Sequence, residues 1–220
     1  MPRNKNPEET IKKIKEVSLK LFLEKGYDET TVLDIVNNLG GLTRGAFYHH
    51  FKSKEEVLEA IFAEEFTDDT HPIKKAQSAQ VENGLERVKL AMKYGMKANF
   101  ENSDVGDIAR LAMSLIQKPR FMAEQLKGNQ EIAAMLTPMI AEGMEDGSIK
   151  PGNPKVIAEM SMLLLNFWLI PDIFPCGIEE TLAKVEVIEQ VLTAIGLNVL
   201  DEEVGELFMK AVDMFGWAKE

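Results

Sequence analysis

Residues that commonly carry catalysis, metal binding or covalent cross-links are scarce in this 220-residue chain. Its one cysteine, Cys176, excludes an internal disulfide and gives no sign of an oxidising compartment. The three histidines are the adjacent pair His49 and His50 and the distant His71, and no metal-ligand spacing, phosphate-binding glycine loop or nucleophile elbow is present. We therefore predict that the protein is not an enzyme and has no catalytic residue, no metal and no cofactor.

Long apolar runs are also missing. The longest, residues 160–170, has 11 residues and is interrupted by Ser161 and Asn166, which makes it too short to span a bilayer. Residues 1–10 are polar and do not form a signal peptide. These features predict a cytoplasmic protein without a membrane partner, and 45% hydrophobic residues are enough for a buried core.

Positive charge is in short supply overall, but it is unevenly placed. The net charge is -11, yet residues 1–54 carry ten Lys and Arg against seven Asp and Glu, whereas the remainder carries 15 against 29. Salt largely screens charges beyond about 10 Å, so only the part of a protein that contacts phosphates has to be positive. A basic amino-terminal region on an acidic body suits nucleic-acid binding, although so small an excess is also common on ordinary helices.

Three helices are predicted at the amino-terminal end, followed by a fourth. Apolar residues recur every three or four positions from Glu8 to Lys25, and Gly26 follows where a left-handed residue usually closes a helix. A capping box at Thr31 starts a second helix, which Gly40-Gly41 ends before a third helix over residues 43–51. Two helices joined by a short glycine-containing turn define a helix-turn-helix. Another capping box at Ser53 begins a fourth helix.

The third helix has the side chains of a DNA recognition helix. Phe47 and Phe51 stand four apart and are expected to face the first two helices, which leaves polar residues for the major groove. Arg44 suits a phosphate or a guanine, unless it is simply solvated, and Thr43 suits a helix cap and a phosphate. Gly45 costs roughly 1 kcal/mol against alanine in a helix, so it indicates a close approach to either DNA or another helix.

Two further residues complete the contacts expected from the pattern itself. His49 and His50 are about 100° apart on a helix, so both cannot face the groove, and we favour His49. Lys54, at the start of the fourth helix, is placed to meet a phosphate together with that helix's amides.

The rest of the chain also has the periodicity of helices, with no alternating strand pattern. We expect residues 67–79 to be a frayed connection. Further helices are predicted at 81–100, 104–118, 121–145, 154–170, 178–195 and 203–215, with Pro138 bending the third of these and Gly128 as a candidate break in it. The predicted fold class is therefore all-α.

Two features of this body point toward association and ligand binding. The second half of helix 154–170 is apolar nearly all round, so it must be covered on more than one side, by the protein's own core or by a partner. Of 12 methionines, 11 lie at position 92 or beyond, which is compatible with an adaptable cavity and equally with ordinary core filling.

Taken together, the amino-terminal motifs resemble the DNA-binding domain of the TetR family of transcriptional regulators. The resemblance rests on the helix from Ile11, the Gly26-Tyr27 corner, Thr30-Thr31-Val32, and residues 43–51 with Lys54-Glu55, about a quarter of the chain. Gly40-Gly41 makes the turn one residue longer than the commonest family pattern. Tyr48 is similar to the family's phosphate-contacting tyrosine, with burial against the first helix as the alternative. The complete set of predicted DNA-contacting residues is Thr31, Thr43, Arg44, Gly45, Tyr48, His49 and Lys54.

The resemblance also implies how the chain is organised: a three-helix DNA-binding domain over residues 1–53, and a larger helical ligand-binding and dimerisation domain over residues 54–220, connected by helix 54–67. It implies that helices 154–170 and 178–195 form a four-helix bundle with their copies, through Leu163, Leu164, Phe167, Leu182, Val185, Ile188 and Leu192. It further implies an effector pocket in the body, for which the candidates are Met92, Met96, Phe100, Leu111, Leu115, Phe121, Met135, Met139 and Trp168.

The function predicted from the resemblance is a homodimeric regulator, most consistent with a repressor, that binds a palindromic double-stranded DNA operator and is released by a small apolar effector. The alternative is a dimeric helical regulator whose body binds a protein partner instead of a metabolite. An enclosed cavity would favour the effector, and an exposed apolar patch without a cavity would favour the protein partner.

Overall fold

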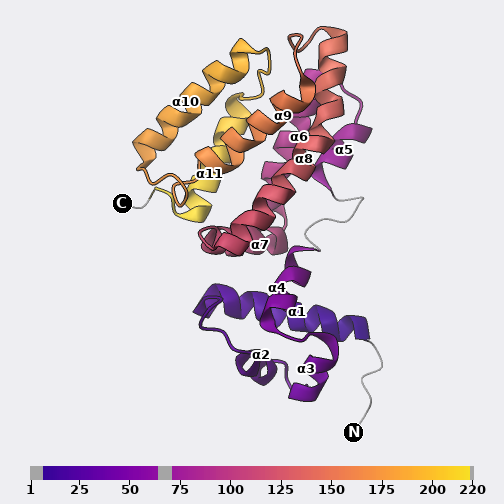
Figure 1. The fold of residues 1–220 in the computed structure, drawn as a ribbon, viewed down its shortest axis with the longest axis vertical. Helices are drawn as coiled ribbons and strands as arrows, with labels where there is room; N and C mark the ends of the chain where they lie inside the picture. The colour runs from indigo at the N-terminus through magenta and orange to yellow at the C-terminus, as the bar shows by residue number, and fades with distance from the viewer. Residues whose placement is uncertain (1–6, 64–70, 219–220) are drawn as a thin grey trace. The chain divides into compact units, whose positions relative to one another are not determined.

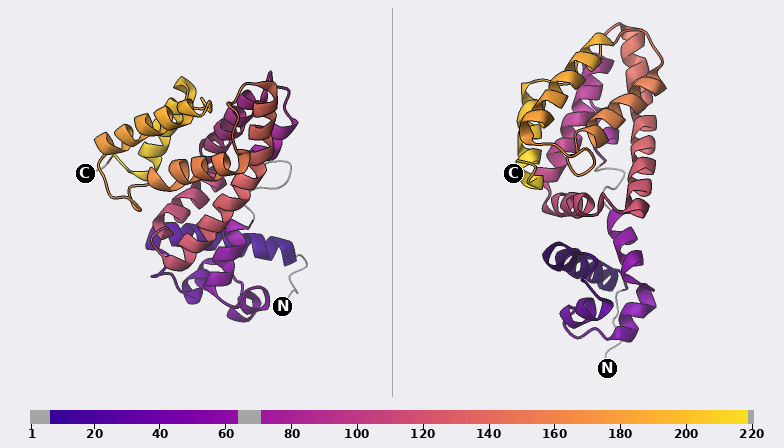
Figure 2. Two further views of the ribbon diagram at one scale, coloured as in Figure 1. Left: turned by 45° about the horizontal axis from the view of Figure 1, so that its top comes forward. Right: turned by 60° about the vertical axis from the view of Figure 1, so that its left-hand side comes forward.

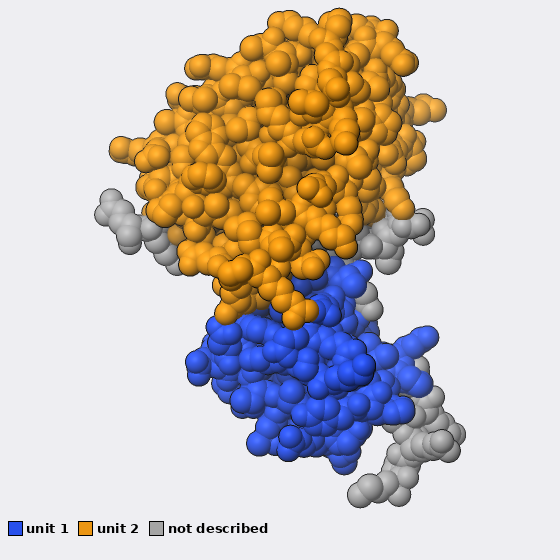
Figure 3. All heavy atoms as spheres, in the orientation of Figure 1, with its two compact units in different colours: residues 1–67, 103–111 blue, residues 68–102, 112–220 orange. Residues whose placement is uncertain are grey.

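The computed structural model describes residues 7–63 and 71–218, and every regular element in those ranges is a helix (Figure 1). The predicted all-α class is confirmed. The chain divides into two compact units, coloured separately in Figure 3: unit 1 comprises residues 1–67 and 103–111, and unit 2 comprises residues 68–102 and 112–220. Among the described helices, none combines the length and the apolar character that crossing a membrane requires.

Unit 1 contains the predicted amino-terminal helices. They are α1 (Pro7–Lys25), α2 (Val32–Asn38), α3 (Arg44–His50) and α4 (Lys54–Phe62). Their amphipathic stripes meet in one core, in which α4 packs along α1 and the side chains of Ile14, Phe22, Ile35, Leu39 and Phe47 are fully buried. The helix-turn-helix arrangement follows directly from these stripes.

The units divide at different positions from the predicted domains. We expected a boundary at residue 53, with residues 54–67 as a connection, whereas α4 groups with unit 1. The first part of α7 (Ser103–Leu115), residues 103–111, also belongs to unit 1. A segment so distant in sequence joins the unit through packing, which local motifs do not reveal.

Unit 2 contains most of the helices of the body. It contains α5 (Pro72–Ser78), α6 (Gly84–Glu101), α8 (Pro119–Asp146), α9 (Pro154–Leu163), α10 (Ile178–Ala194) and α11 (Glu202–Phe215). α8 packs against α6 and α9, and α6 also packs against α5 and α11 (Figures 1 and 2).

Glycine permits the close crossing of α6 and α8. A Cβ atom added at Gly84 would lie 2.1 Å from the backbone nitrogen of Gly143, so no larger residue fits without separating the helices. The amide of Gly84 also donates a hydrogen bond of 2.7 Å to the carboxylate of Asp146 on α8. The start of α6 is thereby fixed against the end of α8.

Three expectations for this unit need correction. Residues 72–78 form α5, because His71 caps the helix and Pro72 occupies its first turn, where a missing amide costs nothing. α8 runs without interruption through Gly128, the candidate break, and contains Pro138 in its interior. The helix predicted to reach residue 170 is α-helical only to Leu163 and continues as a π-helical turn, η1 (Leu164–Trp168).

Candidate nucleic-acid interface

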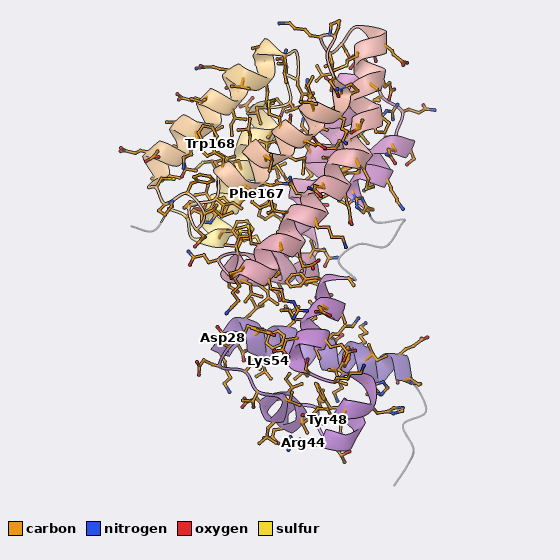
Figure 4. All side chains as sticks on the ribbon, in the orientation of Figure 1. Asp28, Arg44, Tyr48, Lys54, Phe167 and Trp168 are labelled. Carbon is orange, nitrogen blue, oxygen red and sulfur yellow. The ribbon has the colours of Figure 1, made fainter. Side chains whose placement is uncertain are left out.

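The short helix α3 presents a polar face to solvent. At about 100° per residue, Arg44, Gly45, Tyr48 and His49 share one arc of the helix, and Phe47 lies on the opposite side. Burial follows this division, because Phe47 is fully buried while these four residues are exposed. Figure 4 shows Arg44 and Tyr48 together on α3, away from the core of unit 1.

Two of these side chains support each other. The guanidinium carbon of Arg44 lies 5.5 Å from the centre of the Tyr48 ring, a cation–π contact. Tyr48 is 43% exposed, so it is not buried against α1, the alternative that the sequence left open. The arrangement presents a guanidinium and a phenol side by side, both able to donate hydrogen bonds to phosphate or to base edges.

Gly45 lies in the middle of this exposed arc, and the protein itself gives no reason for a glycine there. The nearest atom to an added Cβ is the hydroxyl of Thr43 at 3.8 Å, which is ordinary van der Waals contact. Packing against another helix of unit 1, one of two explanations given by the sequence, is therefore not supported. A glycine that costs helix stability and relieves no internal crowding suits the approach of another molecule's backbone.

The turn before α3 fixes the helix by its backbone conformation. Gly40 has a φ of 63° and Gly41 a φ of 106°, both in the left-handed region that side chains other than glycine rarely adopt. The hydroxyl of Thr43 then accepts a hydrogen bond from the Ala46 amide and caps α3. Turn and cap together fix where the polar face points within unit 1.

The start of α2 is fixed in a similar way. Thr31 accepts a hydrogen bond from the Asp34 amide, and its own amide donates to the Asp34 carboxylate, so the predicted capping box is confirmed. The Lys25 ammonium lies 2.8 Å from the same carboxylate. Hydrogen bonds from Lys25 and Thr31 hold the pKa of Asp34 well below its ordinary value of 3.8.

Lys54 has a different role from the predicted phosphate contact. Its Nζ atom donates hydrogen bonds to the backbone carbonyls of Tyr27, Asp28 and Thr30 at 2.6, 3.0 and 2.9 Å, and it lies 4.5 Å from the centre of the Tyr27 ring. All three ammonium donors are thus used in holding the corner between α1 and α2, near Asp28 in Figure 4. This role could not be predicted from the sequence, because the carbonyl partners of Lys54 are 24 to 27 residues away along the chain.

The two adjacent histidines of α3 differ in exposure. His49 is exposed and His50 is half-buried, so only His49 lies fully on the polar face. Their rings are 5.1 Å apart in an edge-to-face arrangement. The geometry leaves His49 as the residue available to another molecule.

Comparisons with known proteins agree with this geometry. Residues 14–61 match the family described as bacterial regulatory proteins, tetR family. Two curated relatives are the HTH-type transcriptional regulator YhgD of Bacillus subtilis, 28% identical over 73% of this chain and 82% of the relative, and the HTH-type transcriptional repressor KstR2 of Mycobacterium tuberculosis, 28% identical over 62% and 67%. The chain belongs to the TetR family of transcriptional regulators.

Solved structures share the fold of this TetR-family regulator along most of its length. A TetR-family regulator from Syntrophomonas wolfei aligns with a TM-score of 0.62 at 22% identity, covering 90% of this chain and 98% of that one. A structure of SmeT in complex with triclosan also gives 0.62, at 17% identity, covering 92% and 91%. As in the family, a DNA-binding helix-turn-helix precedes a helical body, and the protein is a DNA-binding transcriptional regulator.

Unit 2 of this regulator contains a cavity of about 330 Å³, but most of the predicted pocket residues lie elsewhere. Of the predicted pocket residues, only Met92 and Met96 line this cavity. Leu115, Phe121 and Met139 are buried in side-chain packing, and Leu111 belongs to unit 1. Phe100, Met135 and Trp168 are also outside the lining. The cavity is completed by η1, α10 and α11, and the periodicity of single helices does not show which helices will share a wall.

The predicted dimer contacts need a similar correction. Phe167, Ile188 and Leu192 are buried inside the protomer, and Leu164 and Val185 are half-buried against its core. Leu163 and Leu182 are exposed, as an interface requires. Val187 and Val191 on α10, which were not among the predicted residues, are also exposed, at 45% and 38%.

Proposed function

We propose that the protein is a homodimeric repressor that binds a palindromic operator through α3 of each protomer and is released by a small molecule bound in unit 2. The observation that carries the proposal is the exposed face of α3, where Arg44, Tyr48 and His49 surround the bare backbone of Gly45. The name of the relative KstR2 as a transcriptional repressor supports the sign of the regulation.

DNA recognition is tested by selecting bound duplexes from a random pool with the purified full-length protein. We expect two half-sites in inverted orientation, because two copies of α3 related by twofold symmetry read the two half-sites of a palindrome. Recovery of no enriched sequence at low salt would contradict sequence-specific binding. Recovery of single half-sites without symmetry would contradict the dimer.

Exposed apolar side chains on α9 and α10 support the homodimer. Leu163 on α9 is 48% exposed, and Val187 and Val191 supply an apolar face on α10, whereas the inner side of α10 is already buried in the protomer. Sedimentation of Leu163→Glu and Val191→Glu is expected to show monomers. Leu126→Glu, which replaces an exposed leucine on α8, is the matched control and should leave the dimer intact.

The effector part of the proposal is supported by the cavity in unit 2 and by the triclosan complex of the related fold. An effector that binds one state of the dimer more tightly shifts it toward a spacing of the two α3 helices that no longer fits both half-sites. Such coupling is typically worth about 1 to 3 kcal/mol. The pocket is mainly apolar and partly open to solvent, which supports a small-molecule effector.

A further inference from the structure

The cavity in unit 2 combines an apolar wall with acidic side chains. Its apolar lining includes Met92 and Met96 from α6, Leu165 and Leu169 from the segment around η1, Ile188 from α10 and Phe208 from α11. Its volume of about 330 Å³ lies at the lower end of the range for small-molecule sites. The charged residues of the lining are Glu189, Asp201 and Glu202, so no basic side chain lines it.

These three acidic residues differ in how far the protein already uses them. Asp201 caps α11 by accepting a hydrogen bond from the Val204 amide, and its carboxylate lies 2.7 Å from the Lys93 ammonium. Within the described part of the chain, no ion pair involves Glu189 or Glu202. Two carboxylates from different helices, α10 and α11, therefore border the cavity without a cation of the protein's own.

Gly205 offers an exposed position on the wall of the cavity, where a larger side chain can be introduced. It lies inside α11, where glycine costs about 1 kcal/mol against alanine, and it lines the cavity. A Cβ added there meets no heavy atom within 4 Å, so internal packing does not require its absence. A side chain at this position would project into space that the fold leaves open.

We propose that this cavity binds an amphipathic cation, a small apolar molecule that carries an amine or a quaternary ammonium group. The apolar portion contacts the methionine, leucine and phenylalanine side chains, and the ammonium group lies near Glu189 and Glu202. A carboxylate ligand of the same shape is disfavoured, because no cation of the lining would meet it. The proposal names the chemical class of the effector in the proposed function. Binding of the cation to the cavity is independent of that function, and only the effect of the cation on DNA binding rests on it.

The test measures the binding of three eight-carbon probes to the full-length protein at neutral pH by calorimetry: octylamine, which is protonated there, octanol and octanoate. Octylamine is expected to bind about tenfold or more tighter than octanoate, with octanol between them. In Glu189→Gln the advantage of octylamine over octanol should fall by about threefold to tenfold, as for one or two ionic contacts at a partly exposed site. The control Glu186→Gln removes the same charge from α10 outside the lining and should change nothing.

A second variant separates the cavity from non-specific attraction to an acidic protein. Gly205→Phe places a ring in the open space and should abolish the binding of all three probes while the helical circular dichroism stays unchanged. Octanoate or octanol binding as tightly as octylamine, no binding of any probe, or full binding to Gly205→Phe would each overturn the proposal. If octylamine binds without releasing the selected operator, only the regulatory role is contradicted. If the protein binds no operator at all, the proposed function fails, and the calorimetric result still decides whether the cavity binds an amphipathic cation.

Discussion

The two units of this regulator reach stability by different means. In unit 1, the ends of helices are fixed by specific turns and hydrogen bonds: left-handed glycines at Gly40 and Gly41, hydroxyl caps at Thr31 and Thr43, and the Lys54 ammonium at the first corner. In unit 2, the helices are held mainly by side-chain packing, which leaves a cavity and exposed apolar side chains on α9 and α10. The difference fits the DNA-binding role of unit 1 and the effector-binding role that we propose for unit 2.

Removal of the central aromatic side chain of unit 1 should cause the largest loss of stability in unit 1 relative to unit 2. Phe47→Ala is expected to destabilise unit 1 by about 3 to 5 kcal/mol, because a fully buried ring is replaced by a void. Differential scanning calorimetry should show a lowered transition for unit 1, with the packing of unit 2 retained. A single unchanged transition would contradict the assignment of Phe47 to the core.

Loss of the Lys54 ammonium tests whether this side chain holds the corner or contacts DNA. Lys54→Met should lower the free energy of unfolding of unit 1 by about 2 kcal/mol, since three charge-assisted hydrogen bonds to carbonyls are lost. The neighbouring Lys52→Met is the control and should cost less than about 0.5 kcal/mol. If stability is unchanged and the salt dependence of DNA binding falls by about one phosphate contact, the predicted phosphate role is right after all.

Replacing Gly41 and Gly45 by alanine should change the stability of unit 1 in opposite directions. Gly41→Ala forces a left-handed conformation on alanine and should cost about 1 to 2 kcal/mol in unfolding experiments. Gly45→Ala should instead stabilise unit 1 by about 0.5 to 1 kcal/mol, and it should weaken operator binding, because its methyl group lies on the exposed face of α3. A Gly45→Ala protein that binds the operator as wild type would remove the argument for close backbone approach.

The smallest effect concerns pH. The folded state lowers the pKa of Asp34 below 3.8, so the unfolded chain takes up a proton first as the pH falls. The contribution of Asp34 to stability is therefore complete above its unfolded pKa and is lost progressively below about pH 4. Asp34→Asn should flatten the acid limb of the stability curve of unit 1, and the exposed Glu29→Gln should not.

Local chemistry explains why unit 1 was the more predictable part from the sequence. The caps at Thr31, Thr43 and Ser53 and the left-handed Gly26 depend on residues within one turn, so their patterns carry the whole signal. The role of Lys54 was missed because it depends on carbonyls brought close only by packing.

In unit 2 the periodicity predicted where most helices lie but not which of two apolar faces each one buries. On α10, Ile188 and Val191 both belong to apolar stripes, yet the first is fully buried and the second is exposed. The residues of the π-helical turn at Leu164–Trp168 are equally compatible with an α-helix, so this turn could not be predicted from their pattern. The wall of the cavity combines α6, η1, α10 and α11, and such convergence is a property of the tertiary packing.

The most direct test of the central claim is the affinity of Arg44→Ala for the selected operator, measured at fixed salt beside the wild type and the control Arg120→Ala in unit 2. We expect Arg44→Ala to lose about 1 to 3 kcal/mol and to relax the preference at one base pair of each half-site, while Arg120→Ala binds as wild type. Undiminished affinity and unchanged preference in Arg44→Ala would show that the exposed face of α3 does not read DNA.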